Sequence, residues 1–227
     1  PKEKIDAVIA LYSNGKIEQA IQLIRVLNKD YPNVPLLFNI LGVCHKSLGQ
    51  LKASIKMFDK ATAIKPDYAE AHNNLGITLK ELNQLDDAVK SFQRALTINP
   101  NYAEAHNNLG ITLKELNQLD DAVKSYERAI TIKPDFPEPH NNLGTIFKER
   151  GQFDAAANCY QKALAIKPNY SYALNNLGTI FKERGDLEKA AQHYSKALSI
   201  IPNFAEAHSN TGDLMVSLKR LNEALLS

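Results

Sequence analysis

The stretch AEAHNNLGITLKELNQLDDAVKS at residues 69–91 recurs unchanged at residues 103–125, after a shift of 34 residues. The same frame stays in phase over the whole chain, which indicates one continuous domain, residues 1–227. Six complete units and a partial seventh span residues 1–34, 35–68, 69–102, 103–136, 137–170, 171–204 and 205–227. This period is typical of stacked helical units, which need their neighbours to bury their apolar faces. An array has no single enclosed pocket, so we expect recognition on a surface instead of catalysis.

Each unit is predicted to form two helices joined by a tight turn. In the third unit, apolar residues follow helical spacing over residues 70–82 and again over about 85–98. Asn83 lies between them, and asparagine and glycine are the residues that best tolerate a left-handed turn conformation. The same place holds Gly15, Gly49, Gly151 and Gly185 in other units. Lys219 occupies it in the last unit, where we expect a strained or frayed turn before a second helix cut short at Ser227.

The residues that recur in each unit resemble the tetratricopeptide repeat. In the third unit they are His72, Leu75, Gly76, Leu79, Ala88, Phe92 and Pro100. Histidine mostly replaces the usual aromatic residue at the fourth place, counting from the first residue of a unit. The resemblance extends over the whole chain and implies an all-α fold, a right-handed superhelical solenoid of helix-turn-helix repeats. It also implies a protein-binding scaffold whose concave surface is lined by the first helix of each unit.

Composition excludes several other classes of protein. The chain carries 27 basic and 25 acidic residues, a formal charge of +2, without the basic stripe expected of a nucleic-acid binder. No apolar run approaches the length that spans a membrane, and no signal-peptide pattern is present. Cys44 and Cys159 lie more than three units apart, so we expect two free thiols, a reducing compartment and a cytoplasmic protein.

Candidate catalytic and metal-binding residues do not form a site. Four histidines share the fourth place of their units: His72, His106, His140 and His208. Equivalent helices of successive units are about 8–10 Å apart, too far for shared metal coordination. We therefore expect these rings to be structural. Cys44 and His45 are adjacent in sequence and point to different helix faces, which excludes a nucleophile–base pair. The sequence predicts no catalytic residue, no metal site and no cofactor, and the segment is not expected to be an enzyme.

Recognition is predicted on one stripe of each first helix, at places 2, 6, 9 and 13. The candidate peptide-binding residues at places 2, 6 and 9 are Glu70, Asn74, Ile77, Glu104, Asn108, Ile111, Glu138, Asn142, Thr145, Asn176, Thr179 and Asn210. Glutamate at places 2 and 13 predicts a mostly acidic groove and a neutral or basic ligand. Lysine beside place 13 offsets this charge only in part. Leu36, Ile40 and Val43 on the second unit predict that the apolar part of the ligand lies toward the N-terminal units.

The sixth-place asparagines are the main functional candidates. A primary amide both donates and accepts, so one amide per unit can bind an extended peptide backbone whatever its side chains. The row resembles the asparagine ladder of the repeat domain of O-linked N-acetylglucosamine transferase, with Asn39 of the second unit one place out of register. Alternatively, these asparagines face water or bond to a neighbouring helix. The chaperone carboxylate clamp is disfavoured, because that mode needs Lys and Arg on this surface.

Two other functions remain open on the sequence. Apolar residues near the C-terminal end, Leu225 and Leu226, are expected to stay uncovered and to allow stacks to associate as homo-oligomers. The chain is also expected to be a piece of a longer protein. One alternative is that it selects substrates for an enzyme such as a glycosyltransferase.

Overall fold

In the computed structural model, secondary structure is described for residues 2–226 and side-chain burial for residues 3–219. Every regular element in residues 2–226 is an α-helix. The helices are α1 (Lys2–Ser13), α2 (Ile17–Asp30), α3 (Pro35–Ser47), α4 (Leu51–Ile64), α5 (Ala69–Glu81), α6 (Leu85–Ile98), α7 (Ala103–Glu115), α8 (Leu119–Ile132), α9 (Pro137–Glu149), α10 (Phe153–Ile166), α11 (Ser171–Glu183), α12 (Leu187–Ile200) and α13 (Ala205–Leu226). The all-α fold and the helix pairs of the third unit are confirmed.

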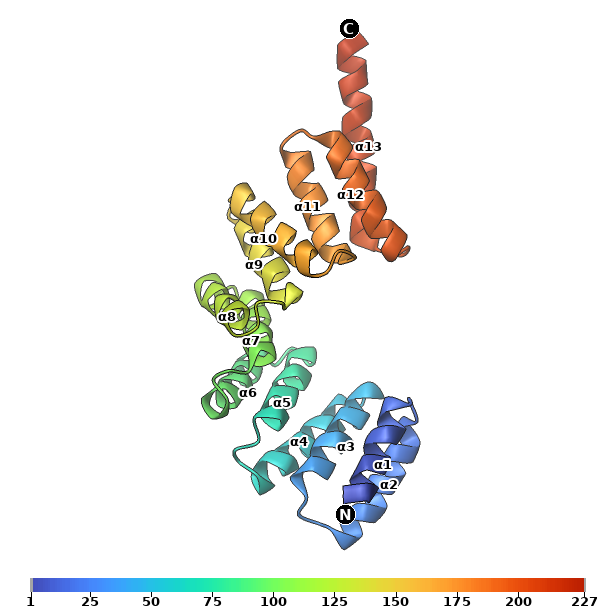
Figure 1. Ribbon diagram of the computed structural model, residues 1–227, viewed down its shortest axis with the longest axis vertical. Coiled ribbons are helices and arrows are strands. Elements are labelled where there is room, and N and C mark those ends of the chain that lie inside the picture. Colours follow the sequence, from blue (N-terminus) through green and yellow to red (C-terminus); the bar gives the residue numbers. More distant parts are fainter. Residues whose placement is uncertain (1, 227) are drawn as a thin grey trace. The chain divides into compact units, whose positions relative to one another are not determined.

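The chain forms two compact units, Pro1–Ala122 and Val123–Ser227, with the boundary inside α8. Within each unit, consecutive helices form antiparallel pairs (Figure 1). In the first unit, α3 packs against α1 and α5, and α5 packs against α7. In the second unit, α11 packs against α9 and α13. Within each unit, the first helices of neighbouring repeats therefore lie side by side, as the repeat pattern predicts.

The turns within the pairs use the predicted left-handed residues. Asn83 and Asn117 have φ angles of 58° and 59°, and the four turn glycines have φ between 70° and 78°. In this region of backbone space a Cβ atom is usually unfavourable, and only glycine and asparagine adopt it readily.

The last repeat departs from the prediction. α13 runs without interruption from Ala205 to Leu226 and is drawn as one long helix (Figure 1). The expected strained turn at Lys219 and the separate second helix are therefore wrong. The physical reason lies in the residues at this place: leucine, lysine and arginine favour helix, and no glycine or asparagine stabilises a left-handed turn.

The eighth-place glycines accommodate an aromatic ring from the second helix of the same repeat. A Cβ atom built on Gly76 would lie 2.7 Å from the Phe92 ring, and one on Gly42 would lie 2.5 Å from Phe58. At Gly76 the Phe92 ring is therefore the close neighbour. The same contact joins Gly144 to Tyr160 and Gly178 to Tyr194. These rings are fully buried.

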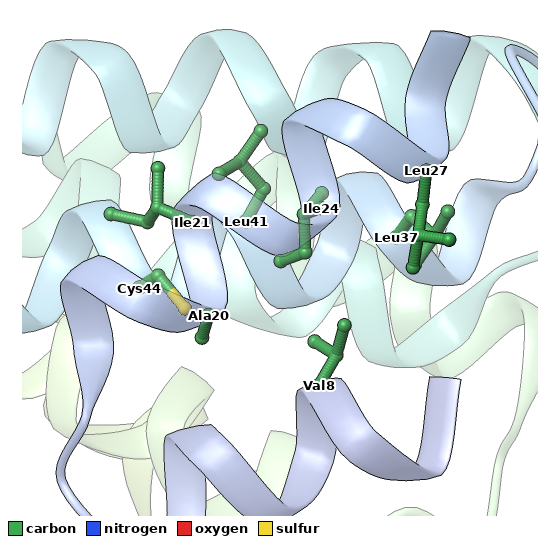
Figure 2. Close-up of a cluster of buried hydrophobic side chains, with 8 residues drawn as sticks. All are labelled: Val8, Ala20, Ile21, Ile24, Leu27, Leu37, Leu41 and Cys44. Atoms are coloured by element: carbon green, nitrogen blue, oxygen red, sulfur yellow. The ribbon is translucent and has the colours of Figure 1, made fainter. Parts of the chain in front are cut away.

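In the first repeat, different residues pack at the positions that hold the glycine and the aromatic ring in other repeats. Val8 replaces the eighth-place glycine, and Ile24 replaces the aromatic residue. Both are completely buried in a cluster formed by α1, α2 and α3 (Figure 2). The cluster consists of Val8, Ala20, Ile21, Ile24, Leu27, Leu37, Leu41 and Cys44. The larger residue on one helix is matched by a smaller one on the other, which keeps the pair in contact.

The fourth-place histidines are structural, as expected. Each ring places Nε2 near the carbonyl oxygen of the proline six residues earlier, at 3.1 Å for His72, 3.4 Å for His140 and 2.8 Å for His208. Because a carbonyl only accepts, Nε2–H is the donor, and it fixes the loop that connects successive repeats. Both cysteines are free and buried, and burial raises the pKa of the Cys44 thiol to about 11.

We predict that Gly76→Ala destabilises the protein and that Gly212→Ala does not. Both changes add the same methyl group to a helix, but only the first forces it against a buried ring. Among the described residues, nothing beyond the adjoining backbone of α13 lies within 4 Å of a Cβ atom at Gly212. Overpacking costs about 1–3 kcal/mol, and this difference should separate the two variants in urea denaturation. Equal unfolding midpoints would contradict the role assigned to the Gly76–Phe92 contact.

Candidate functional site

The first helices of successive repeats are joined by hydrogen bonds between asparagine side chains. In each bond, the Nδ2 of a sixth-place asparagine donates to the Oδ1 of the fifth-place asparagine in the preceding repeat. The distances are 3.1 Å for Asn74 to Asn39, 3.1 Å for Asn108 to Asn73, 3.1 Å for Asn176 to Asn141 and 2.9 Å for Asn210 to Asn175. We call these four contacts the amide bridges. They support the alternative that the sixth-place asparagines bond to a neighbouring helix.

The fifth-place asparagines are the buried partners in these bridges. Asn39 is 2% exposed and Asn175 is 1% exposed. Asn39 Nδ2 donates to Glu70 Oε1 at 3.1 Å, and Asn175 Nδ2 donates to Glu206 Oε1 at 3.1 Å. Each of these two amides therefore bonds to two residues on the first helix of the next repeat, the second-place glutamate and the sixth-place asparagine, which lie one turn apart. A buried amide requires hydrogen bonds at both its nitrogen and its oxygen, and these two asparagines have both.

The fifth-place row was missed in the sequence, where Asn39 looked like a sixth-place residue out of register. The structure shows that Asn39 is a correctly placed member of the buried row. The doublet Asn-Asn before Leu-Gly was the available signal, because one of two adjacent asparagines on a helix must face differently from the other. The spacing alone did not indicate which of the two would be enclosed.

The sixth-place asparagines keep part of their hydrogen-bonding capacity. Asn74, Asn108 and Asn210 are half-buried, and among the residues whose side chains are described their Oδ1 atoms have no partner. Asn176 differs, since it is nearly buried and its Oδ1 accepts from Lys148 Nζ at 3.2 Å. Asn142 is half-buried and its Oδ1 accepts from Asn141 at 3.4 Å. The five asparagines are therefore not equivalent. In each unit, we call the surface that carries them the amide face of that unit, on α5 and α7 in the first unit and on α9, α11 and α13 in the second.

The four candidate residues at the ninth place are half-buried but differ in chemistry. Ile77 and Ile111 present apolar side chains in the first unit. In the second unit, the Thr145 hydroxyl donates to the Asn141 carbonyl at 3.1 Å and lies 3.5 Å from the Tyr160 hydroxyl. Thr179 makes the equivalent contacts, at 3.2 Å and 3.3 Å. Because these threonine hydroxyls already form hydrogen bonds within the protein, they are less available to a ligand.

The acidic character expected from the glutamate count is reduced by pairing between repeats. Lys46 Nζ lies 3.0 Å from Glu81, and Lys80 Nζ lies 3.4 Å from Glu115. The sequence placed these lysines beside the groove but did not show that each reaches the next repeat. Because the pairs are partly exposed, each contributes about 0–1 kcal/mol. Their main effect is to cancel charge at the thirteenth place.

The second-place glutamates retain their influence on the surrounding surface. Glu70, Glu104 and Glu206 are exposed, and Glu138 is half-buried. Burial raises the pKa of Tyr102, and the charges of Glu70 and Glu104 raise it further. In the first unit, the charges of Glu70 and Glu104 therefore act on a neighbouring tyrosine side chain.

The remaining expectations concern metals and membranes. No group of three or more metal-ligating side chains comes together within the part of the chain that the structure describes. Over the same residues, no helix combines the length and the apolar character needed to cross a bilayer.

Comparison with known protein families supports the repeat assignment. The model of the tetratricopeptide repeat matches residues 67–135 and 140–203, and a TPR repeat model matches residues 45–83. The chain belongs to the tetratricopeptide repeat family. Tetratricopeptide repeats form scaffolds for protein–protein interaction, not catalytic domains. No curated protein sequence matches the chain.

Several solved tetratricopeptide structures share this fold. PilF of Pseudomonas aeruginosa has a TM-score of 0.83 at 18% identity, covering 93% of this chain and 96% of its own. PilW, a type IV pilus biogenesis factor, has a TM-score of 0.81 at 23% identity, covering 92% and 96%. YrrB, a TPR protein with an unusual peptide-binding site, has a TM-score of 0.63 at 20% identity, covering 83% and 97%. At these identities the likeness establishes the fold alone.

We predict that Asn175→Ala lowers the stability of the second unit. The change leaves Asn210 Nδ2 without its acceptor and Glu206 without its donor, and such losses cost about 1–3 kcal/mol. Asn203→Ala, in the exposed loop before α13, is the matched control and should change stability by less than about 0.5 kcal/mol. Urea denaturation measures both. A negligible loss in Asn175→Ala would show that the amide bridges do not stabilise the stack.

Proposed function

We propose that the protein binds extended peptides along its amide face, with peptide backbone groups bonded to the sixth-place asparagines. The candidate residues are Asn74 and Asn108 in the first unit and Asn142, Asn176 and Asn210 in the second. Ile77, Ile111, Thr145 and Thr179 flank them, and Glu70, Glu104 and Glu138 favour a neutral or basic ligand. No chemical step is assigned to the chain.

The amide bridge is the observation that supports this proposal. A carboxamide has two N–H donors and one oxygen acceptor. In Asn74 and Asn108 one N–H is held by the preceding repeat, so the plane of the amide is oriented before any ligand arrives. The oxygen and the second N–H then match the N–H and C=O of one peptide residue. Because little side-chain freedom is left to lose, binding avoids part of the usual ordering cost.

The hydrogen bonds of the asparagines also determine which variants can test the proposal. Replacing Asn108, Asn142 and Asn176 together with alanine would remove candidate peptide contacts, but it would also lower the melting temperature. Asn108 and Asn176 each donate an amide bridge, so their loss weakens the stack as well. A valid test must separate these two effects.

Asn73→Ala and Asn108→Ala form the matched pair, because both remove the same amide bridge. Only Asn108→Ala also removes the oxygen on the amide face. We expect both variants to lose stability. Asn73→Ala removes only the fixed orientation of the Asn108 amide, whereas Asn108→Ala also removes its hydrogen bonds to the peptide. Asn108→Ala should therefore weaken binding of a fluorescein-labelled Ser-Ala-Lys repeat peptide about fivefold to tenfold more than Asn73→Ala does. Fluorescence polarisation measures binding, and circular dichroism measures folding.

Equal binding by Asn108→Ala and Asn73→Ala would contradict the proposal. A peptide with methylated backbone nitrogens provides an independent control. It cannot donate to the asparagine oxygens, so it should bind the wild-type protein more weakly than the unmodified peptide.

Self-association is a second candidate, favoured by apolar surface on α13. Met215 is 61% exposed and Val216 is 52% exposed. A neighbouring pocket of about 330 Å³ lies between α12 and α13, with Leu198, Leu214 and Leu218 in its lining. The side chains of Leu225 and Leu226, on which the sequence placed this contact, lie outside the described residues.

We predict that Val216→Lys reduces any concentration-dependent rise in molecular mass measured by sedimentation velocity. A lysine would place its charge on the apolar surface that the contact has to bury. Val26→Lys is the control, since Val26 is similarly exposed, at 57%, on α2 in the first unit. A wild-type protein that stays monomeric over the concentration series would exclude this candidate.

A further inference from the structure

The first unit contains a mostly apolar pocket of about 250 Å³ formed by α1, α3 and α5. Its lining consists of Ile9, Tyr12, Leu36, Asn39, Ile40, Val43 and Glu70. We call it the N-terminal pocket. Ile9 is 44% exposed, so the pocket holds apolar surface that the fold itself does not cover. Uncovered apolar surface inside a concavity is typical of a ligand site.

The pocket exists because the second repeat departs from the polar stripe of the others. Leu36 stands at the second place, where most repeats have glutamate, and Ile40 stands at the sixth place, where the later repeats have asparagine. Without a sixth-place asparagine, α3 cannot donate an amide bridge to α1. Aliphatic side chains occupy the positions that carry polar contacts elsewhere on the chain. The surface is therefore built for an apolar group instead of a peptide backbone.

One side of the pocket carries a negative charge. Glu70 Oε1 accepts from Asn39 Nδ2, which holds the carboxylate at the pocket. The charge of Glu70 also raises the pKa values of Tyr68 and Tyr102, although burial is the larger cause in both. A carboxylate fixed beside aliphatic side chains favours a ligand that combines an apolar group with a neighbouring cation.

The pocket is also connected to the first member of the amide face. Asn39 lies in the pocket lining, and its Oδ1 accepts from Asn74 Nδ2 at 3.1 Å. A side chain in the pocket would therefore place the attached backbone next to Asn74. An extended peptide satisfies both sites at once, which a small apolar molecule cannot do.

We propose that the N-terminal pocket binds one large apolar side chain of the peptide, such as leucine, isoleucine, methionine or phenylalanine, with a lysine or arginine of the same peptide paired to Glu70. This inference rests on the proposed function, since it supplies the selectivity that backbone bonding lacks. The apolar residue also determines the register of the peptide along the amide face. Burial of one such side chain is expected to strengthen binding by about tenfold to a hundredfold.

The test uses three labelled peptides on the whole chain: Ser-Ala-Lys-Leu-Ser-Ala-Ser-Ala, a version with alanine for leucine, and a version with glutamate for lysine. We expect the first to bind about ten times more tightly than the second. The third should also bind more weakly, because it brings a carboxylate to Glu70. Glu70→Gln keeps the acceptor for Asn39 and removes the charge, so it should abolish the preference for lysine over glutamate.

Val43→Phe is the matched variant for the pocket. The larger ring should fill the space and remove the preference for leucine over alanine. If this variant misfolds, methyl resonances of Ile9, Ile40 and Val43 in the wild-type protein give a second readout. They should shift with the leucine peptide and not with the alanine peptide.

The outcomes separate this inference from the proposed function. Equal affinity for the leucine and alanine peptides, without methyl shifts, would overturn the pocket assignment, and Asn108→Ala would still test the amide face. Methyl shifts together with unchanged binding by Asn108→Ala would support the pocket and refute the backbone contacts. A rise in molecular mass that Val43→Phe abolishes would identify a second copy as the occupant and overturn the proposal.

Discussion

A buried carboxamide must form its hydrogen bonds inside the protein, and this requirement links one repeat to the next. Asn39 and Asn175 are almost fully enclosed. Each bonds to two residues that lie one turn apart on the first helix of the next repeat. Apolar contacts allow some sliding between helices, whereas a buried polar network is satisfied in only one arrangement. The amide bridges therefore fix the register of adjacent first helices, and the positions of the candidate binding residues depend on that register.

The same bridges connect stability with recognition. Asn74 and Asn108 each use one N–H to join the stack, and the remaining groups of their amides are the ones assigned to the proposed peptide contacts. Lysines and glutamates behave similarly, because Lys46 and Lys80 reach Glu81 and Glu115 of the next repeat and remove charge from the thirteenth place. What remains in the first unit is a face with oriented amides and with exposed glutamates at the second place. The N-terminal pocket differs because Ile40 interrupts the amide row.

Much of the fold was predictable because its signals are local. Left-handed backbone at Asn83 and the close approach at Gly76 each follow from the properties of one residue type at a known spacing. The stripe of candidate residues was also predictable, since helical periodicity decides which residues share a face. The backbone conformation at Lys219 was not predictable, because a lysine at a turn position is compatible with a strained turn or with the uninterrupted helix α13.

Local signals in the sequence were sufficient to predict the repeat, its two helices, most of its turns and the family. These depend on short-range periodicity and on backbone preferences that each residue carries with it. Packing between repeats determines which asparagine of each pair is buried, which lysine meets which glutamate, and where the second repeat leaves a pocket. Those outcomes depend on contacts between residues about one repeat apart, such as Asn74 with Asn39. The distance and direction of such a contact are set by helix packing, which the order of the residues does not display.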